Sequence, residues 1–106
     1  MIIRSPIYAS DLQSHSRRGP QSLGAIGRLE ETLAALDKTM GTPLFEEVID
    51  NLIVVGSLTR ASDGGHEYLL RVGGEYELEA RIALLVPTET VFAIAIEQPV
   101  LVRNGE

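Results

Sequence analysis

Residues 75–102, EYELEARIALLVPTETVFAIAIEQPVLV, decide the fold of this chain. In their first half, apolar side chains occupy every second position from Tyr76 to Val86, which is typical of a strand with one buried face. A second apolar run follows in residues 90–103, with Phe92, Ile94 and Ile96 in one phase. We therefore predict a hairpin of two long strands joined by a loop at residues 87–89.

The pairing of these strands is constrained, because opposed residues of an antiparallel pair share one face. A three-residue loop at 87–89 sets Leu84 opposite Phe92 and keeps that face apolar. The residues predicted to face the helix layer are Tyr76, Leu78, Ile82, Leu84, Phe92, Ile94 and Ile96.

Two earlier strands, predicted at residues 52–59 and 66–72, extend the same sheet. A loop at residues 73–75 pairs Leu70 with Leu78, and a loop at residues 61–65 pairs Leu58 with Tyr68. On the opposite face these loops pair Arg71 with Glu77 and Glu67 with Arg81, which are both opposite in charge.

One long helix is predicted at residues 21–40, where apolar side chains recur every three or four positions and form a single stripe. Gly41 is a natural end for this helix. A shorter helix is predicted after Thr42 and Pro43, which suit a helix N-terminus, and it ends near Asp50. The stripe of the long helix consists of Leu23, Ile26, Leu29, Leu33, Leu36 and Met40.

The first twenty residues show neither a clear strand alternation nor a helical apolar stripe. Ile2, Ile3 and Ile7 predict a short strand in residues 1–9, which Pro6 confines to a sheet edge. Residues 10–22 are polar and predict a loop, so residues 1–20 are expected to form an extended N-terminal arm. Its adjacent arginines, Arg17 and Arg18, are either part of a solvated loop or a contact for an anion.

These elements predict a single α+β domain over residues 1–106. One long α-helix packs across a four- to five-stranded antiparallel meander sheet, in the order β-α-α(short)-β-β-β-β. In layout, a strand, a helix and four strands resemble cystatin-like and related helix-gripping proteins. A layout of this kind supports many functions, so it implies no activity.

The composition argues against several functions. The chain lacks cysteine, which excludes disulfides, a thiol nucleophile and zinc–thiolate sites. Its net charge of −6 disfavours nucleic acid, and no apolar run approaches the roughly 20 residues that cross a bilayer. We therefore expect no nucleic-acid partner, no membrane contact and no cofactor. We also expect a cytoplasmic location, or a place in a particle assembled inside the cell.

No constellation of residues predicts catalysis. His15 lies in the polar segment and His66 near a turn, and neither has metal ligands at suitable spacing. No nucleophile is placed beside either histidine, so an enzyme is less expected than a binding protein.

The outer face of the last hairpin is unexpectedly apolar. In the predicted register Ala83 meets Ala93 and Leu85 meets Val91, on a face that should be polar if it is wet. A contiguous apolar patch marks an interface, unless the isoleucines of the N-terminal arm cover it. The predicted interface residues are Ala83, Leu85, Val91, Ala93, Ala95 and Leu101.

The chain is therefore predicted to be a non-catalytic protein–protein interaction or assembly protein. It would be a subunit of a larger complex or particle, a homo-oligomer, or a small inhibitor that docks on its target. The alternative is a small-ligand-binding protein or small enzyme with a pocket between helix and sheet. The predicted pocket residues are Arg60, His66, Tyr68, Tyr76 and Gln98.

Overall fold

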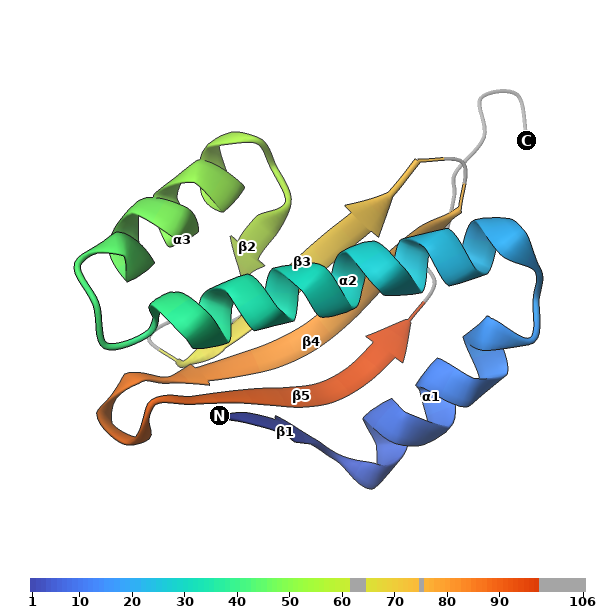
Figure 1. Cartoon of the computed structure of the whole chain (residues 1–106), viewed down its shortest axis with the longest axis horizontal. Coiled ribbons are helices and arrows are strands. Elements are labelled where there is room, and N and C mark those ends of the chain that lie inside the picture. The colour runs from blue at the N-terminus through green and yellow to red at the C-terminus, as the bar shows by residue number, and fades with distance from the viewer. Residues whose placement is uncertain (62–64, 75, 98–106) are drawn as a thin grey trace.

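The computed structural model describes residues 1–61, 65–74 and 76–97 (Figure 1). Within these ranges the fold is α+β, with three helices and a five-stranded sheet in the order β1-β5-β4-β3-β2. The helices are α1 (Pro6–Ser16), α2 (Pro20–Thr39) and α3 (Leu44–Val54). The strands are β1 (Ile2–Arg4), β2 (Leu58–Arg60), β3 (Glu67–Gly73), β4 (Glu77–Leu85) and β5 (Thr90–Glu97).

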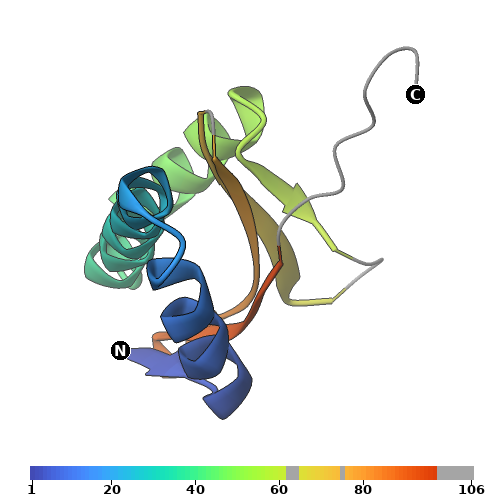
Figure 2. The ribbon, with the colours of Figure 1, turned by 90° about the vertical axis from the view of Figure 1, so that its right-hand side faces the viewer.

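The α+β class is confirmed, but two finer predictions are wrong. The sheet is mixed, because β1 pairs with β5 in parallel while the other neighbours are antiparallel. The described chain has three α-helices, not one long helix and a short one, and a 3₁₀ turn at Val86–Thr88 joins β4 to β5. Figure 2 shows α1 and α2 on the same side of a curved sheet, and α3 lies beside β2 in Figure 1.

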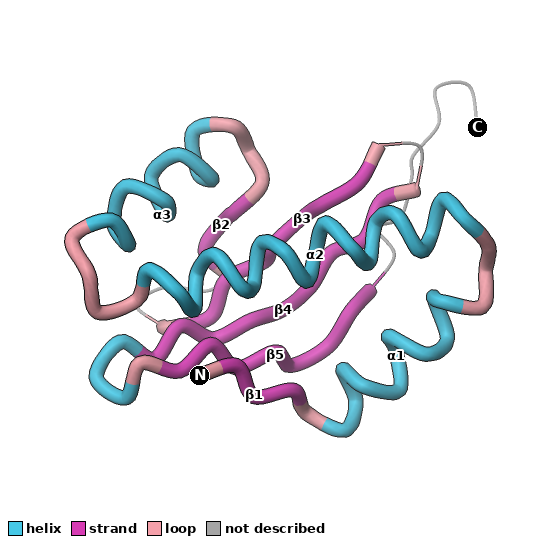
Figure 3. The backbone as a smooth tube through the Cα atoms, in the orientation of Figure 1, coloured by secondary structure: helices cyan, strands magenta, loops and turns pink. Residues whose placement is uncertain are grey.

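Helix α2 lies across the sheet (Figure 3), and the core residues lie between the two. Leu29, Leu33 and Leu36 of α2 are fully buried, as their spacing predicts. Each buried leucine contributes about 1.5–3 kcal/mol of apolar transfer free energy. The first turns of α2 depart from the predicted stripe: Leu23 is 53% exposed, and Ser22 is buried where α1 packs against the helix.

Residues 1–20 do not form an extended arm, because α1 is a regular helix packed against α2 and β5. Ser5 caps α1 by accepting a hydrogen bond from the Tyr8 amide at 3.0 Å, and Pro6 occupies the first turn. The Tyr8 phenol is fully buried and donates to Glu30 Oε2 at 2.7 Å. Arg4 donates to the other oxygen of Glu30 at 2.6 Å, so one carboxylate links β1, α1 and α2.

The strand predicted at residues 52–59 is mostly helical. Helix α3 continues to Val54, and Gly56 ends it with a positive φ of 81° that suits glycine. Glu46 and Glu47 in the first turn of α3 stabilise the helix, because their negative charges lie near the positive end of the helix dipole. Only Leu58–Arg60 remains as β2, an edge strand of three residues.

The pairing of β2, β3 and β4 differs from the prediction by two residues. Leu70 lies opposite Ala80 instead of Leu78, and Leu58 lies opposite Leu70 instead of Tyr68. Side chains alternate with a period of two, so a displacement of two leaves every side chain on its predicted face.

A one-residue β-bulge changes the faces of β5. Ala80 lies opposite Ile96 as predicted, but beyond the bulge Leu84 lies opposite Val91 instead of Phe92. Ile94 is the extra residue, since Arg81 pairs with Ala95 and Ile82 with Ala93. The predicted inward orientation of Phe92, and the outward orientation of Val91 and Ala93, are therefore wrong.

Helix α1 and its cap hold this bulge in place. The Ser5 hydroxyl donates to the carbonyl oxygen of Ile94, and the Asp11 carboxylate accepts the amide of Ile96 at 2.9 Å. Strand β1 pairs only with Val91, Phe92 and Ala93. Beyond the end of β1, side chains of Ser5 and Asp11 thus form hydrogen bonds with the backbone of β5. These hydrogen bonds protect the edge of β5 from pairing with another strand.

Candidate functional site

The first candidate site is the face of the sheet opposite the helices. The register aligns Ile3 of β1, Phe92 of β5 and Ala83 of β4 in one row across three strands. Leu85 follows on the same face of β4, and Ala95 lies on this face of β5 beyond the bulge. We call Ile3, Ala83, Leu85, Phe92 and Ala95 the outer patch.

Within the described residues, all three helices pack on the other face, so the outer patch has no helical cover (Figure 2). Ile3 is 39% exposed, and the other four members are partly buried. The N-terminal isoleucines do not cover the predicted patch. Ile3 lies beside Phe92 and enlarges the patch, Ile2 packs against the core, and Ile7 is exposed on α1.

Three of the six residues predicted for the interface lie on the outer face of the sheet. Ala83, Leu85 and Ala95 lie on the outer face, whereas Val91 and Ala93 are fully buried in the core. Leu101 lies outside the described residues. Phe92 was missed because simple alternation in residues 90–97 gives no sign of a bulge. Ile3 was considered only as a cover for the patch, as part of the N-terminal arm, whereas it lies beside Phe92 in the sheet.

Charged residues border the outer patch on β3 and the first half of β4. Arg71 and Glu79 form an ion pair at 3.0 Å, and Arg81 and Glu67 form another at 3.2 Å. The Glu67–Arg81 attraction was predicted, whereas Arg71 contacts Glu79 instead of Glu77. Such partly exposed pairs stabilise the fold by about 1 kcal/mol or less, but an apolar centre with a charged border is the usual anatomy of an interface.

The second candidate site, the α3 pocket, lies between α3 and the end of the sheet, with a volume of about 280 Å³. It contains three of the five predicted pocket residues: Arg60, His66 and Tyr68. Its lining is Phe45, Glu46, Ile49, Asp50, Arg60, His66, Tyr68, Leu84 and Val86.

The walls of the α3 pocket differ in charge. Glu46 and Asp50 lie one turn apart on α3 and form an acidic wall. On the strand side, the Arg60 guanidinium lies 5.7 Å from the centre of the Tyr68 ring, a favourable cation–π distance. Buried Phe45 and Leu84 contribute apolar lining between these walls.

The other two predicted pocket residues lie elsewhere. The Tyr76 hydroxyl is 3.0 Å from Nδ1 of His15, which ties the end of α1 to the sheet. Burial lowers the pKa of His15, and the charge of Arg18 lowers it further while Asp11 opposes the change. His15 is 8% exposed and acts here as a packed structural residue. Gln98 lies outside the described residues.

A larger cleft of about 430 Å³ lies between α2 and the sheet edge at β3. Charges of both signs line it, with Arg28 and Glu31 from α2 and Arg71 and Glu77 from the strands. Because these charges are mixed along the cleft, it has no wall of one sign that would orient a charged ligand.

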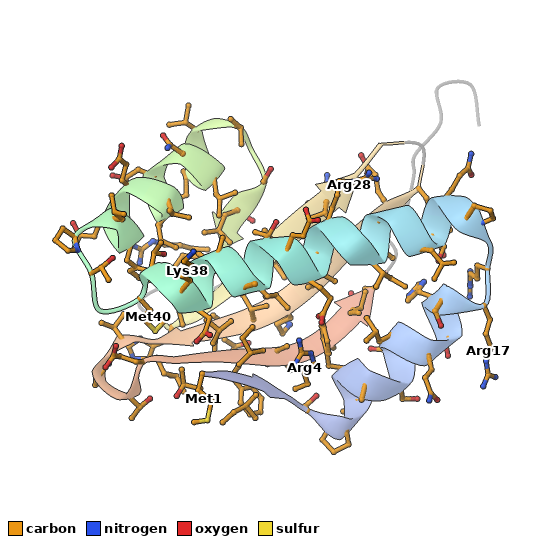
Figure 4. All side chains as sticks on the ribbon, viewed as in Figure 1. Met1, Arg4, Arg17, Arg28, Lys38 and Met40 are labelled. Carbon is orange, nitrogen blue, oxygen red and sulfur yellow. The ribbon has the colours of Figure 1, made fainter. Side chains whose placement is uncertain are left out.

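The two candidate anion contacts, Arg17 and Arg18, follow the last turn of α1 and are exposed. Figure 4 shows Arg17 projecting away from the body of the molecule, in contrast to Arg4, which lies between α1 and α2. Cations at a helix C-terminus interact favourably with its dipole, which explains an arginine here without a ligand.

In the described ranges, no three histidine, aspartate or glutamate side chains form a group that could hold a metal ion. Nor does any helix there have the length and apolar character needed to cross a bilayer. Comparison with known proteins gives no match to a family model, to a curated protein or to a solved structure.

Proposed function

We propose that this chain is a non-catalytic protein–protein interaction or assembly protein that binds a protein partner through the outer patch. The observation that supports this proposal is the row of Ile3, Phe92 and Ala83, which crosses three strands without helical cover in the described residues. An antiparallel sheet face left in water is normally polar. A contiguous apolar patch on such a face is typical of an interaction site.

The charge of the chain favours a different protein over a second copy. Each chain carries a net charge of −6, so two copies repel one another. A partner with an apolar centre and a border of lysine and arginine would instead complement the acidic surface and associate faster at low salt.

The test compares Phe92→Asp, in the outer patch, with Thr59→Asp. Thr59 is exposed on the same face of edge strand β2, outside the patch. Partners captured with the wild-type chain from native cells are purified, and their binding is then measured with all three purified forms. We expect wild type and Thr59→Asp to bind equally, and Phe92→Asp to bind about tenfold more weakly or worse, as at an interface hot spot.

Circular dichroism and urea unfolding establish that each variant is folded before binding is compared. Equal binding by Phe92→Asp and wild type would refute the role of the outer patch. Light scattering that shows a dimer of wild type, lost in Phe92→Asp, would replace the heterologous partner by a second copy of the chain.

A further inference from the structure

We infer that the α3 pocket binds a zwitterionic small molecule with an apolar body, of the size and type of a large free amino acid. The pocket is lined by Tyr68 and Leu84 from the helix-covered face of the sheet, whereas the outer patch lies on the opposite face. The inference is therefore independent of the proposed protein interaction.

The size of the α3 pocket suits a small ligand. Its volume of about 280 Å³ lies just below the usual range of about 300–1,000 Å³ for small-molecule sites. Helix α3 and strands β2, β3 and β4 contribute to the lining, together with His66 and Val86 beside the strands. A dinucleotide or other large cofactor would exceed this space.

The apolar part of the lining comes from two sides. Phe45 and Ile49 are four residues apart on α3, so they share one face of the helix. Leu84 and Val86 from the end of β4 complete this part of the lining, and Val86 is 49% exposed at the edge. An aliphatic or aromatic side chain of a ligand would be buried among these four residues.

The acidic wall calls for a cation. Glu46 and Asp50 are both exposed and four residues apart, where like charges repel. Among the residues that the structure describes, neither carboxylate forms an ion pair with a basic side chain. A ligand ammonium group would relieve this repulsion by donating hydrogen bonds to an oxygen of each carboxylate.

The strand wall calls for an anion. The guanidinium of Arg60 is held near the Tyr68 ring, and within the described residues it has no carboxylate partner. The cation–π contact does not neutralise the guanidinium, so its fork of N–H donors stays able to bind a carboxylate. His66 lines the same side and supplies a further polar group.

A single ligand satisfies all three parts of the lining only if it carries an ammonium group, a carboxylate and an apolar side chain. A fatty acid would leave the acidic wall unpaired, and an aliphatic amine would leave Arg60 unpaired. The larger cleft beside α2 lacks this separation of charges.

The test uses isothermal titration calorimetry with L-phenylalanine and L-leucine as probes. Phenylpropanoate, which lacks the amine, and phenethylamine, which lacks the carboxylate, serve as matched comparators. We expect at least one amino acid to bind, and phenylalanine to bind about tenfold more tightly than either comparator or better. Absence of binding by both amino acids up to about 10 mM, or equal binding of phenylalanine and phenylpropanoate, would overturn the inference.

Two variants separate the walls. Arg60→Gln should weaken phenylalanine about tenfold while leaving phenethylamine unchanged, and Asp50→Asn should weaken phenethylamine more than phenylpropanoate. Arg28→Gln, in the other cleft, and Phe92→Asp, in the outer patch, are controls that should leave phenylalanine binding unchanged. Unchanged phenylalanine binding in a folded Arg60→Gln protein would show that the pocket does not use this arginine, and would refute the assignment.

Discussion

Val91 and Phe92 are adjacent in β5, yet the bulge places them on opposite faces of the sheet. Val91 is fully buried opposite Leu84, whereas Phe92 is partly exposed opposite Ala83 on the outer face. The same substitution at these two positions therefore tests the register directly. We predict that Val91→Asp prevents folding or nearly does so, and that Phe92→Asp is tolerated.

The expected magnitudes follow from burial. A chain of 106 residues has a free energy of unfolding of about 5–15 kcal/mol. Val91→Asp loses about 1.5–3 kcal/mol of apolar burial and adds several kcal/mol for an unpaired buried carboxylate, in total about 5 kcal/mol or more. Phe92 has most, but not all, of its side chain buried, so Phe92→Asp loses about 1–2.5 kcal/mol of apolar burial.

Urea unfolding followed by far-ultraviolet circular dichroism measures both effects. With a slope of about 1–2 kcal/mol per molar urea, Phe92→Asp should lower the midpoint by about 1 M. Val91→Asp should leave no cooperative transition, or one close to zero urea. An uninterrupted alternation through β5 would bury Phe92 instead, so the opposite order of stabilities, or equal losses, would refute the bulge.

Three further predictions concern α1. Burial lowers the pKa of His15, so the unfolded chain takes up a proton near pH 6.5 that the folded chain resists. The free energy of unfolding from urea titrations should therefore fall as the pH drops below about 6.5, and His15→Gln should lose this part of the slope. Tyr8→Phe removes the donor to the Glu30 carboxylate and should cost about 1.5–3 kcal/mol in the same assay; a loss under about 0.5 kcal/mol would contradict the contact. Asp11→Ala leaves the Ile96 amide without its acceptor, which should cost about 1–3 kcal/mol and speed hydrogen exchange of that amide by NMR, and unchanged exchange would disprove this role.

The parts of the fold that were predicted from sequence are those set by local periodicity. The spacing of Leu29, Leu33 and Leu36 predicts the buried side of α2, and alternation predicts the inward face of β4. The errors in pairing among β2, β3 and β4 were of two residues, and these do not move a side chain to the other face.

The parts that were missed depend on distant partners. Helix α1 is too polar to show a stripe, and its contacts join Tyr8 to Glu30 and Asp11 to Ile96. In α3, the β-branched residues Ile53 and Val54 suggested a strand, but they extend an existing helix and stay exposed. The bulge at Ile94 is likewise held by groups far away in the sequence.

The same difference between local and distant contacts separates the pocket residues that were predicted from those that were missed. Arg60 and Tyr68 lie opposite each other on β2 and β3, and His66 comes directly before β3, so all three line one pocket although the predicted pairing of these strands was two residues out. The acidic wall formed by Glu46 and Asp50 was missed, because nothing local shows which way α3 turns these carboxylates.

The place of β5 in the sheet has a consequence for biosynthesis. Among the described strands β5 is made last, yet it lies between β1 and β4 and pairs Ile2 with Val91. Until it leaves the ribosome, β1 lacks its partner and β4 has an unpaired edge, while the leucines of α2 lack part of their cover. Contacts between such distant residues form slowly, so these unpaired strand edges should stay exposed to wrong pairing until β5 is inserted.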